Sequence, residues 1–313
     1  MLTRRTVILC TREATYGTDP VMTGSNGLLA WDVDIDVKGE ILERDVLRDT
    51  LTPMPHVIGM KDVTVSFKTE LKGGGLSGTG AAAPEYDPLL HACALGTAEI
   101  TGTSLVYEPK SAESNIGSAS LKVYKDGNLH KIVGARGTFK TTFEAGQYGV
   151  LEWELSGKYT PVIADTIPDV GGLANVLPPI VYNSSFQIGG FSPVCSRAMI
   201  DLANDVVRRA DLNASYGVDS FRIAARKPVI EFDVDAVVES SNPFWTDWAG
   251  DVIDTYSINL GTTAGNKVQF SGIFQYNSNK YGDADGVSQY ECVAALCSSN
   301  ADGEDDEMVL TFA

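Results

Sequence analysis

Histidine and cysteine, the residues that most often hold metals or act as nucleophiles, are scarce in this sequence. The three histidines (His56, His91 and His130) are scattered through the first half, and the second half has none. The five cysteines form an odd number without a Cys-x-x-Cys pair, which indicates reduced thiols in a protein made in the cytoplasm. No Gly-x-Ser-x-Gly motif presents a nucleophilic serine. We therefore expect no enzyme, no metal site and no cofactor.

Long apolar runs are missing as well. After Arg4 and Arg5 the only apolar run is residues 6–10, which is too short for the core of a signal peptide, and no later segment approaches the length of a membrane span. Basic residues are outnumbered, with 24 Lys and Arg against 41 Asp and Glu and a net charge of −17. Because nucleic-acid binding is driven by neutralising phosphates, this balance argues against a tight grip on DNA or RNA. The acidity either serves solubility or marks a surface that must not hold a polyanion.

The composition that is present favours a β protein. Hydrophobic residues make up 43% of the chain, and mean hydropathy is −0.03, as in soluble globular proteins. Short Val-, Ile-, Thr-, Tyr- and Phe-rich runs lie between Gly, Asn, Asp and Pro clusters, which is the pattern of strands and turns. Residues 31–37 alternate strictly, so that three aspartates share one face and apolar side chains the other.

Local signals place further elements. Asp87, Pro88 and Gly96 suit the start and the end of a helix over residues 87–96. Strands are expected at residues 63–69, 121–125, 130–143 and 149–157, with a hairpin turn at Asp126 and Gly127. Residues 283–286 begin like a calcium loop, but the later glutamate is absent at the needed spacing, which indicates a turn.

The stretch 36–44 returns as residues 201–209, each reading acid, apolar, two small or polar residues, acid, two apolar residues, a polar or charged residue and arginine. Four further stretches recur in the same order: 63–67 as 229–235, the helix at 87 as residues 242–250, 130–133 as 266–270, and 149–155 as 286–292. We interpret this order as an internal duplication. The predicted organisation is an arm at 1–27, a domain at 28–160, a Pro/Gly-rich linker at 161–179 and a second domain at 180–313.

With this repeat, the chain resembles the tail tube (major tail) proteins of long-tailed double-stranded DNA bacteriophages. The resemblance spans nearly the whole chain and depends on residues 13–20, the acidic strand and the 36–44 run, and then on residues 186–190, 201–209, 219–228 and 281–286. It implies a mainly β chain of two tandem tail-tube-like β-sandwich or partial-barrel domains, each with a short flanking helix. In that family inner sheets join between subunits around a lumen, and rings present six copies of the fold. A duplicated chain is therefore expected to form a trimeric, pseudo-hexameric ring rather than a hexamer.

The resemblance also implies the function and the partners. The chain is expected to be a structural virion protein, made in the host cytoplasm and placed in the tail, that forms stacked rings for DNA ejection. The alternatives are a related tail-end ring and a contractile-injection or secretion tube component. Expected partners are further copies of the chain, tail terminator, tape-measure and tail-tip proteins, and double-stranded DNA that passes without specific binding; no membrane is involved.

Two groups of site residues follow from these expectations. A wall that guides DNA must not bind phosphates, and the two acidic rows either supply such a wall or face the outer solvent; they are Asp32, Asp34, Asp36, Glu231, Asp233 and Asp235. Ring stacking through long loops and arms involves Tyr16, Asp19, Arg44, Arg48, Pro53, Pro55, His56, Arg208, Arg209, Asp211 and Tyr216. A carbohydrate-binding role for Trp245 and Trp248 is the third possibility, against packing of both rings on the sheet.

Overall fold

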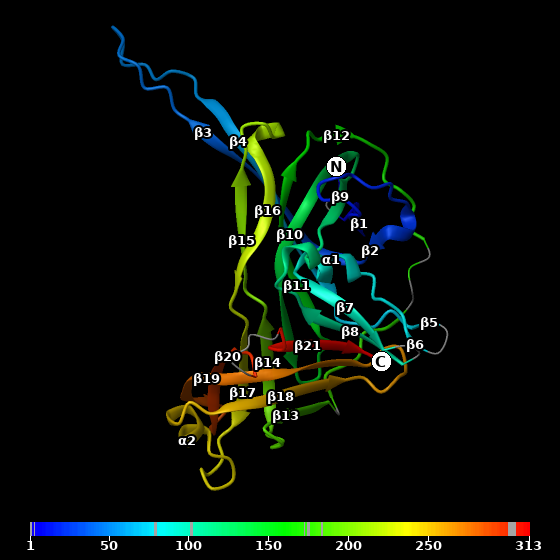
Figure 1. Ribbon diagram of the computed structural model, residues 1–313, viewed down its shortest axis with the longest axis vertical. Helices are drawn as coiled ribbons and strands as arrows, with labels where there is room; N and C mark the ends of the chain where they lie inside the picture. The colour runs from blue at the N-terminus through cyan, green and yellow to red at the C-terminus, as the bar shows by residue number, and fades with distance from the viewer. Residues whose placement is uncertain are drawn as a thin grey trace.

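The computed structural model describes residues 2, 4–77, 80–100, 103–171, 173, 176–182, 184–299 and 305–313. Antiparallel strands make up most of it, and the two α-helices are short (Figure 1). The predicted mainly β fold class is confirmed.

The strands of the first half pair in the order β1–β9–β10–β11–β4–β3, all antiparallel. Their bounds are β1 Thr6–Arg12, β3 Ala30–Leu42, β4 Val57–Glu70, β9 Ala119–Lys125, β10 Asn128–Glu144 and β11 Val150–Tyr159. The three strands expected between 121 and 157 are therefore present, with slightly wider bounds. Asp126 and Gly127 connect β9 to β10 with φ values of 41° and 105°, the left-handed conformation that a two-residue hairpin requires.

The strands of the second half pair in the order β13–β18–β19–β20–β17–β14, again all antiparallel. Their bounds are β13 Ser185–Ile188, β14 Cys195–Asp201, β17 Val229–Asp235, β18 Ile253–Leu260, β19 Val268–Ala284 and β20 Val287–Leu296. Position by position along the chain, this is the pairing order of the first half. β10 and β19 both have 17 residues, and β11 and β20 both have 10.

One joint connects the two halves into a single sheet. The end of β10, from Lys140 to Glu144, pairs antiparallel with Arg197 to Asp201 of β14. As a result β3, β4, β11, β10, β14, β17, β20 and β19 run side by side in this order, and we call them the long sheet. The last strand, β21 (Met308–Phe312), adds a second connection, because it pairs with both β19 and β8 (Ser104–Pro109). β8 also pairs with β7 (Leu95–Ile100).

One face of the long sheet is the core. Its largest buried side chains include Phe67, Phe139, Trp153, Phe232 and Phe274, all at alternate positions of their strands. Helix α1 (Asp87–Ala92) buries Leu89 and Leu90, and helix α2 (Phe244–Ala249) buries Phe244. Both helices begin within two residues of the expected positions.

The aromatic rings of α2 pack on the protein. Trp245 stacks on Tyr281 with ring centroids 5.4 Å apart, and the Trp248 indole N–H donates to the Asn277 carbonyl oxygen at 3.1 Å. This geometry favours the packing interpretation over a sugar platform.

Two hairpins project from the sheet. β3 and β4 continue upward to an exposed tip at residues 43–56, and β15 (Asn204–Ala210) pairs with β16 (Val218–Arg226) beside them (Figure 1). Of the two stretches expected as loops, residues 44–56 carry no strand and only residues 57–60 belong to β4, whereas residues 218–226 of the stretch 210–227 form β16. Small strands complete the fold: β2 Gly27–Leu28, β5 Leu76–Ser77, β6 Gly80–Ala81 and β12 Ile163–Ala164.

The N-terminal stretch differs from the expected arm. Residues 6–12 form β1, which pairs with β9 along its whole length. Ile8, Leu9 and Cys10 are buried there, so the run that is too short for a signal peptide fills a core position. In the expected linker, β12 pairs with the start of β10; residues 172, 174 and 175 lie outside the described part of the chain.

Candidate assembly surfaces

The face of the long sheet opposite the core is polar, and it brings all six predicted acidic residues together. Cross-strand neighbours share a face, and the register places Asp34 opposite Ser66, with Glu154 next in the row. A second row runs Glu144, Arg197, Asp233, Glu291 and Lys280. The two acidic rows, nearly 200 residues apart in the sequence, therefore lie on one surface.

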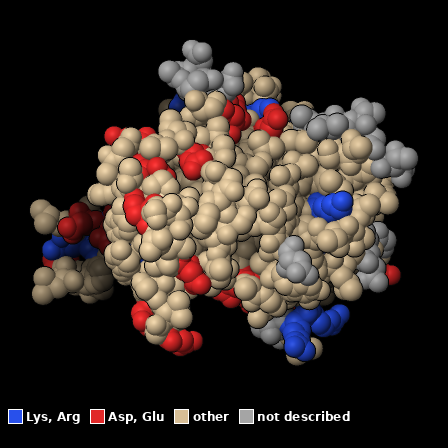
Figure 2. Space-filling model, turned by 90° about the horizontal axis from the view of Figure 1, so that it is seen from below, with Lys and Arg blue, Asp and Glu red and all other residues tan. Residues whose placement is uncertain are grey.

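Ion pairs balance only part of this polar face. The Glu152 carboxylate lies 3.1 Å from the Lys68 amine and 3.5 Å from the Lys140 amine, and the Arg197 guanidinium lies 3.6 Å from the Asp233 carboxylate. Such partly exposed pairs each contribute about 0–1 kcal/mol. Among the described residues no cation pairs with Asp34, Glu154, Glu231 or Asp235, so carboxylates are in surplus. Asp and Glu are also more widely spread than Lys and Arg on the surface that is seen from below (Figure 2).

Asp32 sits at an irregularity of the polar face. The register of β3 against β4 shifts between Trp31 and Asp34, and Asp32 has φ 52°. Its carboxylate lies 3.8 Å from the Lys68 amine. β14 carries a comparable shift against β17, between Cys195 and Arg197, so both strands have a bulge near their start.

The tip of the β3–β4 hairpin holds five of the predicted stacking residues. All five are exposed there: Arg44, Arg48, Pro53, Pro55 and His56. Two apolar residues of the same tip were missed by the sequence interpretation. Leu47 and Leu51 are fully exposed there, at 103% and 104%. Their signal in the sequence was a group of apolar residues, Val46, Leu47 and Leu51, in a stretch that is otherwise mostly charged or polar. Exposed apolar side chains gathered on a projecting element are typical of a surface that another molecule covers.

Other predicted stacking residues contact their own chain. The Tyr16 hydroxyl donates to the Gly134 carbonyl oxygen at 2.9 Å and accepts from the Phe221 N–H at 2.7 Å. Burial raises the pKa of this hydroxyl to about 12. Asp19 pairs with Lys122 at 3.0 Å and with Lys131 at 3.3 Å.

The second hairpin is held in the same way. Arg208 pairs with Asp62 of β4 at 2.8 Å. Tyr216 contacts Tyr159 edge to face at 5.0 Å, and the Lys61 amine lies 5.2 Å from its ring centre. The Asp211 carboxylate accepts the Asn213 N–H at 3.0 Å within its own loop, and Arg209 is exposed.

A buried carboxylate that the sequence interpretation missed holds the segment after β1. Glu13 accepts the Ser118 and Ser120 hydroxyls at 2.6 and 2.5 Å, and the N–H groups of Gly134 and Gly17 at 2.7 Å each. Hydrogen bonds to an ionised acceptor are stronger than neutral ones. Glu13 and Tyr16 therefore attach the N-terminal segment to β10. No local pattern around Glu13 indicates this role, because Ser118, Ser120 and Gly134 are all more than a hundred residues away.

The long sheet ends in two edges that have no partner strand. Within the described residues β3 pairs with β4 alone, and the part of β19 after Asn277 pairs with β20 alone. Their counterparts in the internal joint, β14 and the end of β10, are paired on both sides. Unpaired edges of this length are templates for pairing with another chain.

The described residues contain no group of three or more His, Cys, Asp or Glu side chains placed to hold a metal ion. In the same part of the chain no helix has both the length and the apolar character needed to cross a membrane. The surfaces that the fold does organise are a polar sheet face, two open edges and a projecting hairpin, which define a protein that assembles.

Comparison with known proteins agrees with this class. The family model described as phage tail tube protein matches residues 3–313, and the chain belongs to that family. It is thus a structural component of the virion tail, as the resemblance implied. A search of curated proteins found no match.

Proposed function

We propose that copies of this chain close into rings, that the rings stack into the tail tube, and that the tube conducts the genome into the host cell. The observation that carries the proposal is the long sheet, whose two end edges are unpaired and correspond to the two strands of its internal joint. Family membership supports the tube itself.

In the proposed ring, the end of β19 in one chain pairs with β3 of the next chain, as β10 pairs with β14 inside a chain. The bulges suggest the register. The bulge of β10 ends at Arg136 and that of β19 at Ser278, while those of β14 and β3 end at Arg197 and Asp34. Transferring the internal pairs Lys140–Asp201 and Glu144–Arg197 then places Gly282 opposite Lys38, Ala284 opposite Asp36, and Gly286 opposite Asp34 of the neighbour.

We further propose that residues 28–160 and 180–313 are two tandem copies of the tail-tube domain. The repeated pairing order supports this division. If the family ring has six domain positions, three chains fill it, and the ring has threefold symmetry with a pseudo-sixfold arrangement of domains.

The polar face of the long sheet is the proposed lumen wall. Its surplus of carboxylates repels phosphates, so DNA passes without the affinity that cationic contacts would add. The core face then points outward, where α1 and α2 cover it. The β3–β4 tip is the proposed stacking element, with tail terminator, tape-measure and tail-tip proteins as the partners at the ends and inside the tube.

Electron microscopy of purified, concentrated protein tests the proposal. We expect stacked rings with threefold or pseudo-sixfold end views. Rings that never stack would favour the tail-end ring instead, and a monomer at every salt and protein concentration would overturn the proposal.

A further inference from the structure

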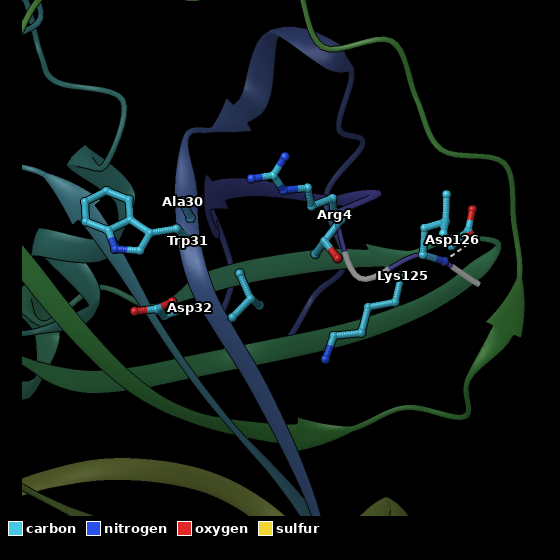
Figure 3. A pocket seen from close by; sticks show the side chains of 9 residues that line it. Arg4, Ala30, Trp31, Asp32, Lys125 and Asp126 are labelled. Carbon is cyan, nitrogen blue, oxygen red and sulfur yellow. Dashed lines mark hydrogen bonds between the residues drawn. The ribbon is translucent and has the colours of Figure 1, made fainter.

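A cavity of about 640 Å³ opens beside the unpaired edge of β3. Arg4, Lys125 and Asp126 line one side of it, and Trp31 and Asp32 of β3 line the other (Figure 3). The cavity thus lies between the bulge of β3 and the segment that leads into β1.

The internal joint has a filled counterpart of this position. There the β10–β11 turn lies against the bulge of β14 and the segment that leads into β13. The Ala145 N–H donates to the Ser196 carbonyl oxygen at 3.2 Å, and the Gly146 N–H donates to the Val181 carbonyl oxygen at 2.9 Å. In return the Val181 N–H donates to the Gln147 carbonyl oxygen at 2.7 Å.

We infer that the cavity is a socket for the β19–β20 turn, residues 283–286, of a second copy of this chain. The inference rests on the proposed ring closure and names the contact that accompanies it. In the repeated pairing order the β19–β20 turn corresponds to the β10–β11 turn, although only residues 285 and 286 separate Ala284 from Val287, whereas residues 143–149 separate Thr142 from Val150. The shorter turn therefore reaches the socket with its aspartate side chains. β3 corresponds to β14, and residues 2–5 precede β1 as residues 180–184 precede β13. Only a neighbouring chain can supply the turn, because β19 and β3 end opposite sides of the long sheet.

Charge complementarity supports the same occupant. The turn carries Asp283 and Asp285. Asp285 is exposed and has φ 53°, and the Asp283 carboxylate accepts the Gly286 N–H at 3.2 Å. Among the described residues, neither Arg4 nor Lys125 makes an ion pair. The two positive charges of the socket therefore meet the two negative charges of the turn when the turn enters.

The carboxylates already in the socket have cations of their own. Asp126 forms an ion pair with Arg5 at 3.0 Å and accepts the Leu2 N–H at 2.7 Å. Asp32 lies 3.8 Å from the Lys68 amine. They leave Arg4 and Lys125 as the basic groups for an incoming acid.

The internal joint lacks this charge pair. Its turn, residues 145–149, reads Ala-Gly-Gln-Tyr-Gly, and the receiving residues 180–182 read Ile-Val-Tyr. Covalent connection brings those two segments together, whereas a joint between chains must be found by diffusion. Opposite charges steer such encounters and select the register, so aspartates on the turn and basic groups in the socket suit a joint between copies.

Charge reversal tests the socket in the full-length chain. Arg4→Glu with Lys125→Glu sets acid against acid, and we expect the protein concentration needed for rings to rise at least about tenfold at low salt. Adding Asp283→Lys and Asp285→Lys to the same chain restores opposite charges and should return assembly close to the wild type. Lys227→Glu with Lys267→Glu is the matched control, because both lysines are exposed and the change in net charge is the same.

The outcomes separate the two proposals. Thermal melts at low concentration show that each variant folds before its assembly is scored. If the wild type forms rings and the Arg4/Lys125 variant forms them equally well, or if the four-fold variant is not rescued, the socket is wrong and ring closure stands. If the wild type forms no rings, ring closure fails and the socket fails with it.

Discussion

Arg208 and Asp62, 146 residues apart in the sequence, are joined by an ion pair of 2.8 Å in which the guanidinium donates to the carboxylate. The pair connects the β15–β16 hairpin to the base of the β3–β4 hairpin. Asp62 is largely buried at 12% exposure, whereas Arg208 is 35% exposed. The sequence analysis placed Arg208 among the ring-stacking residues, and in the structure it pairs with an acid of its own chain.

Replacing Arg208 tests the strength of that connection. We expect Arg208→Ala to lower the free energy of unfolding by about 1 kcal/mol, because the pair is partly screened by solvent. Chemical denaturation measures the change, and Arg209→Ala, on the same strand and exposed, is the control. An Arg208 variant as stable as the control would show that the pair contributes nothing to the fold.

Tyr16 predicts a pH dependence of stability at high pH. Its folded-state pKa is raised to about 12 from 10, so the unfolded chain loses this proton at lower pH than the folded chain does. The stabilisation is complete below pH 10 and disappears as pH rises towards 12, with a slope of up to about 1.4 kcal/mol per pH unit. We expect Tyr16→Phe to remove this part of the slope in denaturation curves between pH 10 and 12.

The same variant has a cost at neutral pH. Phenylalanine leaves the Gly134 carbonyl oxygen and the Phe221 N–H without the hydroxyl, which destabilises by about 1–3 kcal/mol. Tyr182→Phe, at an exposed tyrosine, should change neither the slope nor the neutral stability. Parallel alkaline curves for wild type and Tyr16→Phe would contradict the assignment.

Substitution of Leu47 and Leu51 should impair ring stacking and leave the fold of the single chain unchanged. Changing both to serine removes apolar surface that is fully exposed in the single chain, so the free energy of unfolding should stay within about 0.5 kcal/mol of wild type. Tube length in electron micrographs should fall sharply while single rings persist. The control is Leu177→Ser, an exposed leucine outside the hairpin; long tubes from the Leu47/Leu51 variant would exclude the tip as the stacking contact.

Deletion of residues 1–20 should impair folding, whereas deletion of a free arm would impair stacking alone. It removes β1 together with Ile8, Leu9 and the Glu13 hydrogen bonds, so the chain should be severely destabilised rather than merely unable to stack. Circular dichroism melts distinguish the two results. A fully stable truncated chain would show that β1 is dispensable.

The proposed register between chains is open to direct cross-linking. Asp36→Cys and Ala284→Cys in one chain should form disulfides between neighbours, because directly opposed residues bring Cα atoms to about 4.5–5.5 Å, within disulfide reach. Asp36→Cys with Lys280→Cys places the thiols about four residues out of register and is the matched control. Equal cross-linking of both pairs under oxidation would contradict the register.

Local sequence was sufficient for much of the fold. Alternation at 149–157 and at 229–235 predicted β11 and β17, because a strand with one buried face has period two. Asp126-Gly127 and the 283–286 stretch predicted turns through residues that tolerate positive φ. The acidic rows were also identified from alternation, because charged side chains at every second position of a strand must lie on the face away from the core.

The loop expected at 210–227 was overestimated because polarity was taken as a sign of irregular structure. β16 buries Val218, Ser220 and Phe221, but its remaining residues are mostly exposed and lack the alternation that a buried face imposes. Among the expected stacking residues, Tyr16, Asp19, Arg208 and Tyr216 are engaged inside the chain, and no spacing rule could have paired them with partners so distant.

The sequence by itself determined which side chains face the core, where the chain turns, and that one family of acidic residues avoids the apolar face. Only the tertiary structure decided that both acidic rows lie on one sheet face, that β10 joins β14, and that β3 and the end of β19 remain unpaired. Periodicity assigns a face to each strand from its own residues, whereas the choice of neighbouring strands depends on contacts between segments far apart in the chain.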